Sequence, residues 1–118
     1  MKTIMLVDDS TSIRNILKNA LIGDYTITEA EDGVKALEKI KTQEVNLFLF
    51  DVNMPEMDGL TLLGEVRKLP QHKTTPILML TTETKDELKQ RGRELGASGW
   101  IVKPCEPERL LSAIKKLI

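Results

Sequence analysis

The sequence predicts an α/β fold in which helices cover both faces of a five-stranded parallel sheet. Short, almost unbroken apolar runs occur at 4–7, 47–50, 77–80 and 100–102. Runs of this kind are typical of strands buried on both faces of a parallel sheet. Stretches with helical spacing of apolar residues separate them, and strands that alternate with helices favour right-handed crossovers and parallel pairing.

One weaker strand and five helices complete the pattern. Residues 25–28 alternate apolar and polar side chains and are interpreted as an edge strand. Apolar residues recur at helical spacing over 13–21, 34–40, 62–69, 88–95 and 110–117. We expect the first helix to be capped within Ser10–Ser12, the fourth to begin with a Thr84/Glu87 capping box, and the fifth to begin at Pro107.

This order of elements predicts a doubly wound (βα)5 sandwich of three layers, flavodoxin-like, with strand order 2-1-3-4-5. We expect residues 1–118 to form one domain, because single domains most often contain about 100–150 residues. In such sheets ligands bind beyond the carboxyl ends of the strands, where the order reverses between strands 1 and 3. We therefore expect a ligand site at that edge of the sheet.

Composition excludes several classes of protein. The single cysteine excludes a disulfide framework and a cysteine-based zinc site, and it fits a reducing compartment. The apolar start, 4–7, is cut off by Asp8 and Asp9 and is too short for a signal peptide or a membrane span. A net charge of −1 excludes a nucleic-acid binder that works by bulk electrostatics. We expect a soluble, cytoplasmic, monomeric domain.

Charge is divided unevenly along the chain. Residues 1–84 hold nine Lys and Arg against thirteen Asp and Glu, whereas residues 85–118 hold eight against five. Solvated helix faces explain such a division without any function. The alternative is an acidic site early in the chain and a mildly basic docking face late in it.

Polar residues stand at the carboxyl ends of four predicted strands: Asp8-Asp9, Asp51, Thr81-Thr82 and Lys103-Pro104. Each alone is explained as a helix cap, a turn residue or a surface lysine. The predicted fold, however, brings the ends of strands 1 and 3 side by side, where three carboxylates repel one another. A bound hard cation resolves this repulsion, and carboxylate oxygens with water suit Mg²⁺.

Carboxylates, a magnesium ion, a hydroxyl and an ammonium in one crevice indicate phosphoryl transfer. The metal and Lys103 would offset charge on the phosphoryl oxygens, and Thr81 would donate a hydrogen bond. A carboxylate can itself be the nucleophile and form an acyl phosphate. Asp51 is the best candidate, because it ends the central strand.

These residues resemble the signature of the receiver domains of two-component response regulators. The matching elements, in order along nearly the whole chain, are Asp8-Asp9, Asp51 with Asn53-Met54-Pro55 and Asp58-Gly59, Thr81, and Lys103-Pro104. Within that family, residues 51–63 and 96–104 look most like the single-domain chemotaxis regulators.

The resemblance implies a role for each acidic residue. Asp51 would accept phosphate from a histidine kinase. Asp9, Asp51 and the backbone carbonyl of Asn53 would bind Mg²⁺, and Asp8 would act through a bound water.

The resemblance also implies how the phosphoryl group is held. The Thr81 hydroxyl and the Lys103 ammonium would bind it, together with the backbone amides of Asn53 and Thr82. The Lys103–Pro104 bond would be cis, as X-Pro bonds can be. Trp100 would take the place of the switch aromatic, which turns inward when Thr81 moves toward the phosphate.

Several residues depart from the family pattern or call for a structural explanation. Trp100 is bulkier than the usual Tyr or Phe, and Cys105 stands where Phe is often found. We expect Cys105 to be a small buried hydrophobe and His72 to be a surface residue rather than a relay histidine. Met54 and Met57 are expected to pack near the site rather than to bind metal.

We therefore expect a signalling module whose only catalysis is its own phosphorylation and dephosphorylation. Its partners would be a sensor histidine kinase, a downstream target such as the flagellar motor switch, and a phosphatase. The resemblance implies an output face made of the fourth helix, the fifth strand and the fifth helix. Because the chain ends shortly after Leu117 with no DNA-binding domain, we expect no direct control of transcription.

Two alternatives within the signalling class stay open, and two classes outside it are disfavoured. The chain could be a phosphorelay intermediate or a regulator outside chemotaxis. A phosphatase of the haloacid dehalogenase type would want an acid at the position of Asn53, and usually a cap domain for which 118 residues leave no room. A flavin carrier would place its phosphate among repelling acids, without a Gly/Ser/Thr-rich loop after the first strand.

Overall fold

The computed structural model describes residues 1–54, 57–82, 84–104 and 106–118. The expectation for Cys105, and the part of the motif at Pro55, lie outside these residues. Strands and helices alternate along the chain in this order: β1 (Thr3–Val7), α1 (Thr11–Leu21), β2 (Thr26–Ala30), α2 (Gly33–Ile40), β3 (Leu47–Asp51), α3 (Gly59–Arg67), a short 3₁₀ helix η1 (Pro70–His72), β4 (Ile77–Thr81), α4 (Asp86–Leu95), β5 (Gly99–Val102) and α5 (Pro107–Leu117).

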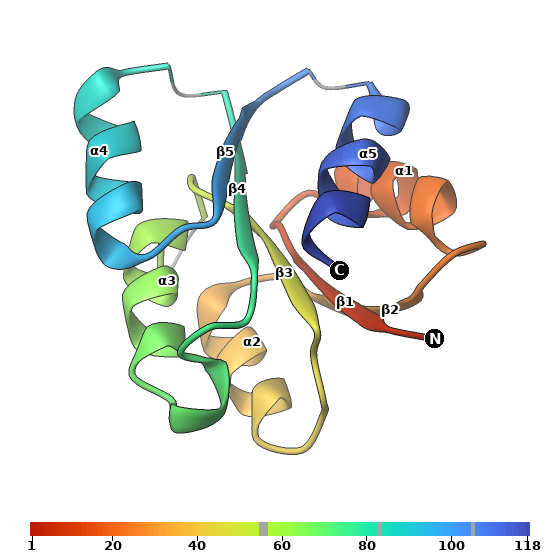
Figure 1. Ribbon diagram of the computed structural model, residues 1–118, viewed down its shortest axis with the longest axis horizontal. Helices are drawn as coiled ribbons and strands as arrows, with labels where there is room; N and C mark the ends of the chain where they lie inside the picture. Colours follow the sequence, from red (N-terminus) through yellow and green to blue (C-terminus); the bar gives the residue numbers. More distant parts are fainter. Residues whose placement is uncertain (55–56, 83, 105) are drawn as a thin grey trace.

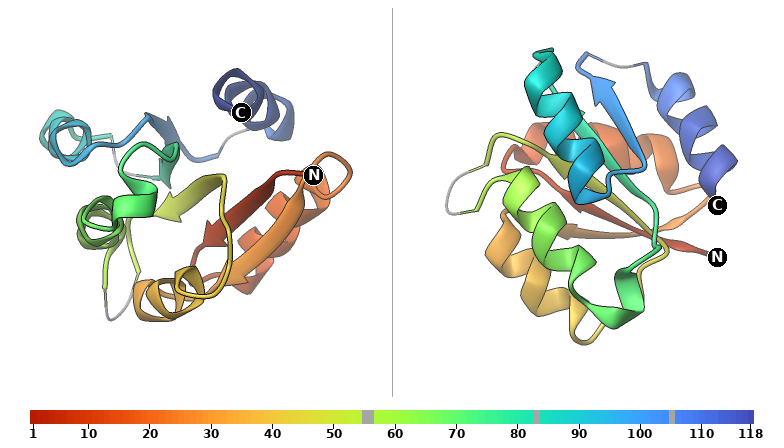
Figure 2. Two further views of the ribbon diagram at one scale, coloured as in Figure 1. Left: turned by 60° about the horizontal axis from the view of Figure 1, so that its bottom comes forward. Right: turned by 60° about the vertical axis from the view of Figure 1, so that its left-hand side comes forward.

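The five strands form one parallel sheet in the order β2-β1-β3-β4-β5, so the predicted fold is confirmed. Helices α1 and α5 cover one face, and α2, α3 and α4 cover the other (Figures 1 and 2). Each face has its own apolar cluster. The carboxyl ends of the strands share one edge, at the top of Figure 1 for β4 and β5.

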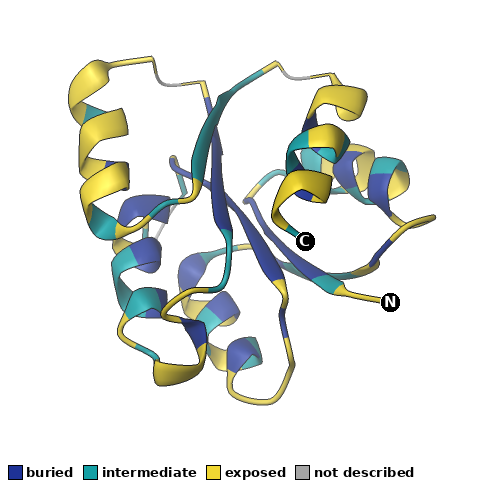
Figure 3. Ribbon diagram, in the orientation of Figure 1, coloured by how far each residue is buried: buried dark blue, intermediate teal, exposed yellow. Residues whose placement is uncertain are grey.

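Burial explains why the central strands are continuous apolar runs. Every residue of β3 and β4 is buried (Figure 3). Phe48 and Phe50 pack toward α2, α3 and α4, whereas Leu47 and Leu49 pack toward α1 and α5. Since successive side chains of a strand point to opposite faces, no position in β3 can be polar until the strand reaches its end at Asp51. The weaker run forms β2, at the predicted edge, where most residues are partly exposed.

Short polar side chains start three of the helices. Ser10, Asp32 and Asp58 accept hydrogen bonds from the backbone N–H groups three residues further on and so cap α1, α2 and α3. Helix α5 begins at Pro107, as predicted. Among the described residues, no helix is long and apolar enough to cross a membrane.

The prediction for the start of α4 is wrong. The helix begins at Asp86, its N-cap is Lys85, and no side chain caps it. Thr84 lies one residue too early to cap it, and Glu87 is therefore the second helical residue. Asp86 and Glu87 in the first turn instead complement the positive end of the helix dipole.

The prediction for His72 is also wrong, because its side chain is 4% exposed. The residue ends the 3₁₀ helix η1, and its ring stands edge-on to Phe48 with centroids 5.0 Å apart. Its Nδ1 lies 2.9 Å from Thr75 Oγ1, and its carbonyl accepts from Arg67 Nη1 at 2.8 Å. A short 3₁₀ helix folds this polar segment back onto the sheet, which the residue types alone do not reveal.

Burial, assisted by the Arg67 charge, lowers the pKa of His72 below its ordinary value of 6.5. The unfolded chain then binds a proton more readily than the native protein, so the stability given by neutral His72 is present above pH 6.5 and is lost as pH falls toward the native pKa. We expect the free energy of unfolding of the wild type to fall between pH 7.5 and 5.5 relative to His72→Gln. Urea denaturation at both pH values measures this difference. Parallel pH profiles for the two proteins would contradict it.

Candidate functional site

Three carboxylates meet where β1 and β3 end. Asp8 and Asp9 follow β1, Asp51 ends β3, and oxygens of all three lie within 4.8 Å of one another. The strand order places the two strands side by side, with Val7 opposite Phe50. The structure therefore brings together the acids that the sequence singled out.

Lys103 joins the two buried acids of this cluster. Its Nζ lies 3.0 Å from Asp8 Oδ2 and 3.4 Å from Asp51 Oδ1. Asp8 and Asp51 are 4% and 7% exposed, so both carboxylates are removed from most of their water. The other Asp8 oxygen, Oδ1, accepts from the Ser10 N–H at 2.9 Å. Both oxygens of Asp8 are thus engaged.

The Asp51 carboxyl is under opposing influences. Burial raises its pKa above the ordinary value of 3.8, and the Asp8 charge raises it further. The Lys103 ammonium and the backbone N–H of Asn53 act in the opposite direction. A partly desolvated carboxylate that is still paired with an ammonium is a chemically competent oxygen nucleophile.

Asp9 differs from its two neighbours, because its side chain is exposed. Among the described residues it has no hydrogen bond or ion pair, so its oxygens are available to a ligand. A free carboxylate beside two others is a donor set that suits a hard cation with oxygen ligands. The chemistry of the cluster therefore fits Mg²⁺.

Gly59 fixes the path of the chain just beyond Asp51. Its N–H donates to the Val52 carbonyl at 2.9 Å, and a Cβ atom there would lie 2.1 Å from the Asp51 carbonyl oxygen. Only glycine allows this approach. The Asp58-Gly59 pair in the sequence thus has two structural roles: Asp58 caps α3, and Gly59 closes the loop onto the end of β3.

Thr81 ends β4, and Lys103 follows the last residue of β5, Val102, at the same edge. Thr81 is fully buried, its register partner is Val102, and its carbonyl accepts from the Lys103 N–H at 2.7 Å. Thr82 is exposed at the start of the following loop, as is Asn53 after β3. The Lys103–Pro104 bond is cis, as the resemblance implied.

Trp100 lies on the α4 side of the sheet. It pairs in register with Met79, two residues before Thr81, so Trp100 and Thr81 occupy the same face. The ring is partly buried against α4, where a Cβ atom at Gly92 would lie 3.0 Å from its Cζ3 atom. Met54 and Met57 pack against the apolar cluster of this face, as expected.

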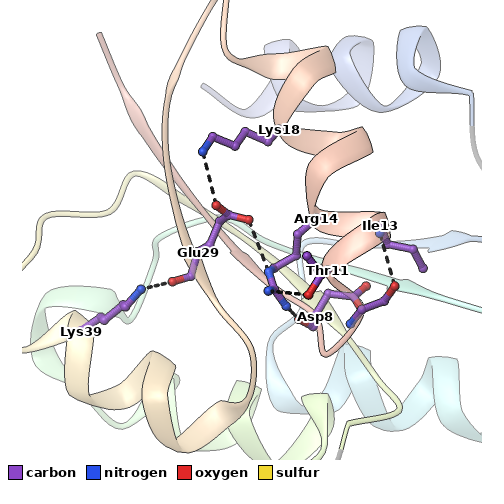
Figure 4. Close-up of polar contacts among 8 residues, drawn as sticks. Asp8, Thr11, Ile13, Arg14, Lys18, Glu29 and Lys39 are labelled. Carbon is purple, nitrogen blue, oxygen red and sulfur yellow. Dashed lines mark hydrogen bonds and ion pairs between the residues drawn. The ribbon is translucent and has the colours of Figure 1, made fainter.

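One contact beside the cluster was missed by sequence reasoning. Arg14, in α1, donates to the backbone carbonyl of Asp8 and pairs with Glu29 of β2 (Figure 4). The sequence feature that could have indicated this contact is Glu29 within the predicted edge strand, together with Arg14 in the predicted first helix. Neither residue type is diagnostic alone, since exposed ion pairs are common.

The fold and the acidic pocket with its lysine define a receiver domain. The family model of the response regulator receiver domain matches residues 4–115, and the chain therefore belongs to this family.

Within the family the chain is CheY-like. It is 36% identical to a chemotaxis protein CheY homolog of Campylobacter jejuni, over 98% of this chain and 91% of the relative. The crystal structure of chemotaxis protein CheY4 of Vibrio cholerae is 44% identical, with a TM-score of 0.96, over 100% of this chain and 99% of that one. A CheY-like receiver domain protein of Methanospirillum hungatei is 33% identical, with a TM-score of 0.92, over 98% and 92% of the two chains.

Membership of this family implies three properties. Receiver domains are signalling proteins of two-component systems. They imply a histidine kinase partner and a downstream target. They typically bind Mg²⁺ at an acidic pocket, and this chain has an acidic cluster of Asp8, Asp9 and Asp51.

The crowding of these acids should cost stability. Because the pKa of Asp51 is raised, its contribution to stability is present at low pH and is lost as pH rises through the native pKa. Without Mg²⁺ at pH 7, Asp51→Asn should therefore raise the melting temperature. We expect a rise of a few degrees, which corresponds to about 1 kcal/mol in the free energy of unfolding. Lys103 keeps Asp8 as its partner in this variant.

Thermal melts in EDTA measure this effect, and the advantage of Asp51→Asn should shrink as pH is lowered. Asp9→Asn should give a smaller gain, because Asp9 is exposed, and Asp24→Asn, in an exposed turn, should give none. Mg²⁺ should stabilise the wild type by mass action and Asp51→Asn less. A melting temperature for Asp51→Asn at or below that of the wild type at pH 7 would contradict the argument.

Proposed function

We propose that this chain is a phosphate-accepting response regulator in which Asp51 receives a phosphoryl group from a histidine kinase. The observation that carries the proposal is that Asp51 lies beside Asp8, Asp9 and Lys103 at the carboxyl ends of the strands. The transfer breaks the P–N bond of the kinase phosphohistidine and forms a P–O bond to an Asp51 oxygen. The histidine imidazole leaves with the electron pair of the P–N bond, so no further reactant is needed.

Each residue around Asp51 has a part in this reaction. The Asp51 carboxylate attacks, and Lys103, already 3.4 Å away, stays within reach of the incoming phosphoryl oxygens. The Thr81 hydroxyl and the backbone N–H groups of Asn53 and Thr82, which follow the same strand ends, would donate hydrogen bonds to those oxygens.

Asp9, Asp51 and the Asn53 carbonyl would hold the magnesium ion, and Asp8, whose oxygens are engaged by Lys103 and Ser10, would act through water. When bound, Mg²⁺ supplies positive charge that offsets the charge of the transferring phosphoryl group. Burial of Asp8 and Asp51 strengthens all these interactions, because the local dielectric is lower than that of water.

The output face would consist of α4, β5 and α5. Basic residues from both helices, Lys89, Arg93, Arg109 and Lys116, line pockets beside Trp100. The phosphorylated form would bind its target here, and the flagellar motor switch is our candidate because the curated relatives are chemotaxis proteins. We propose that the protein is cytoplasmic and monomeric and that residues 1–118 form one receiver domain. A role in a phosphorelay or a non-chemotaxis pathway would leave the chemistry at Asp51 unchanged.

The acceptor assignment is tested by labelling. Incubation with acetyl phosphate or a histidine kinase and Mg²⁺ should give one acid-stable, base-labile adduct on Asp51, detected by mass spectrometry. Asp51→Asn should abolish it while the fold is kept. Asp9→Asn should slow labelling, with partial recovery at higher Mg²⁺. Labelling that persists in Asp51→Asn, or that needs no Mg²⁺, would overturn the assignment.

The switch is tested by the fluorescence of Trp100, the only tryptophan. When the phosphoryl group draws the Thr81 hydroxyl toward Asp51, it vacates volume on the face that Trp100 shares. Beryllofluoride with Mg²⁺ should therefore shift Trp100 emission and reduce its quenching by iodide, whereas Mg²⁺ alone should have little effect. Thr81→Ala should bind metal yet lose most of the change. Unchanged emission and quenching in protein that has bound the mimic would remove Trp100 from the mechanism.

A further inference from the structure

The Arg14 side chain joins three elements beside the acidic cluster (Figure 4). Nη1 donates to the Asp8 carbonyl at the end of β1, and Nε lies 3.3 Å from Glu29 Oε1 in β2. Nη2 lies 3.4 Å from Thr11 Oγ1 in the first turn of α1. The side chain is only 13% exposed, so these contacts replace most of its water.

Glu29 balances the charge of this guanidinium. Its other oxygen, Oε2, lies 3.5 Å from Lys18 Nζ, and its backbone carbonyl accepts from the Lys39 ammonium. Of these three cations, Arg14 is the one that also reaches the Asp8 backbone. Its planar fork suits this, because two of its nitrogens can bond to separate acceptors at once.

The Asp8 carbonyl matters because it belongs to the same planar peptide unit as the Asp9 nitrogen. Holding that carbonyl fixes the plane, and with it the start of the Asp9 side chain. Asp9 itself has no polar partner among residues 1–54, 57–82, 84–104 and 106–118. Its direction relative to Asp51 therefore depends on the backbone. Arg14 holds the Asp8 carbonyl of that backbone, while the Asp8 N–H donates to the Ala30 carbonyl and the Ser10 N–H donates to Asp8 Oδ1.

We propose that Arg14 is a positioning residue for the divalent-cation site, acting through the Asp8–Asp9 peptide to aim the Asp9 carboxylate at the cation. This inference rests on the proposed function, since it takes Asp9 as a metal ligand. Groups that orient metal ligands from outside the coordination shell change metal affinity by about 10–100-fold when they are removed.

The test compares three variants of the full chain. Arg14→Met removes the fork and keeps the aliphatic stem, whereas Arg14→Lys keeps the charge but has a single nitrogen. We expect both to weaken divalent-cation affinity by about tenfold. Lys18→Met is the matched control, because it also removes a Glu29 ion pair but leaves the Asp8 carbonyl bonded. Its affinity should equal that of the wild type.

Affinity is measured on metal-free protein at pH 7, by electron paramagnetic resonance of free Mn²⁺ and by the Mg²⁺-dependent rise in melting temperature. A purely structural role would lower the metal-free melting temperature of the Arg14 variants and leave their affinities within twofold of the wild type. A role for charge alone would tighten binding in Arg14→Met and leave Arg14→Lys unchanged. Either result overturns the proposal. If Arg14→Met does not fold, Arg14→Lys gives the answer.

The same data separate this inference from the proposed function. Wild-type binding that Asp9→Asn weakens, together with unaltered binding in both Arg14 variants, would overturn the role of Arg14 alone. Absence of any binding to the wild type would overturn the metal site and, with it, the role of Arg14.

Discussion

Two buried carboxylates, Asp8 and Asp51, share the Lys103 ammonium at the edge of the sheet. This shared contact constrains the order and the direction of the strands that carry the three residues. Lys103 follows β5, whereas Asp51 ends β3, with β4 between them. Strands lie about 4.8 Å apart, so the ammonium must cross roughly 10 Å, which requires a side chain as long as lysine or arginine. The pairing is possible only because all the strands run in parallel and bring their carboxyl ends to one edge.

This shared ammonium leaves the pocket with more negative than positive charge, since Asp9 stands beside it without a partner among the described residues. The sheet tolerates the excess because its interior is otherwise apolar and fully buried in β3 and β4. The buried apolar strands stabilise the protein, whereas the repulsion among the carboxylates is confined to the carboxyl ends of the strands. Such a division is common in functional sites, where groups arranged for chemistry reduce stability.

The fold could be predicted from the sequence because burial on both faces forces β1, β3 and β4 to be apolar runs. The gathering of the acids followed from topology, since Asp8 and Asp51 end adjacent strands. His72 and Arg14 could not be predicted in this way. Their positions depend on a 3₁₀ turn and on a contact between α1 and β2, which hydrophobic periodicity does not encode. The prediction that Thr84 caps α4 is wrong because the start of a helix is set by the backbone conformation of a single turn, which the residue types alone do not determine.

Helix α4 buries fewer of its residues than α3 or α5. Its one buried residue is Gly92, which leaves room for the Trp100 ring, and no side chain caps its start. Its outer surface is exposed along most of its length (Figure 3). A glycine within a helix costs about 1 kcal/mol relative to alanine. Local opening should therefore need less free energy in α4 than in α3, and amide hydrogens of α4 should exchange with solvent earlier. The segment beside the tryptophan should thus rearrange at a lower cost in free energy than α3, with the sheet intact.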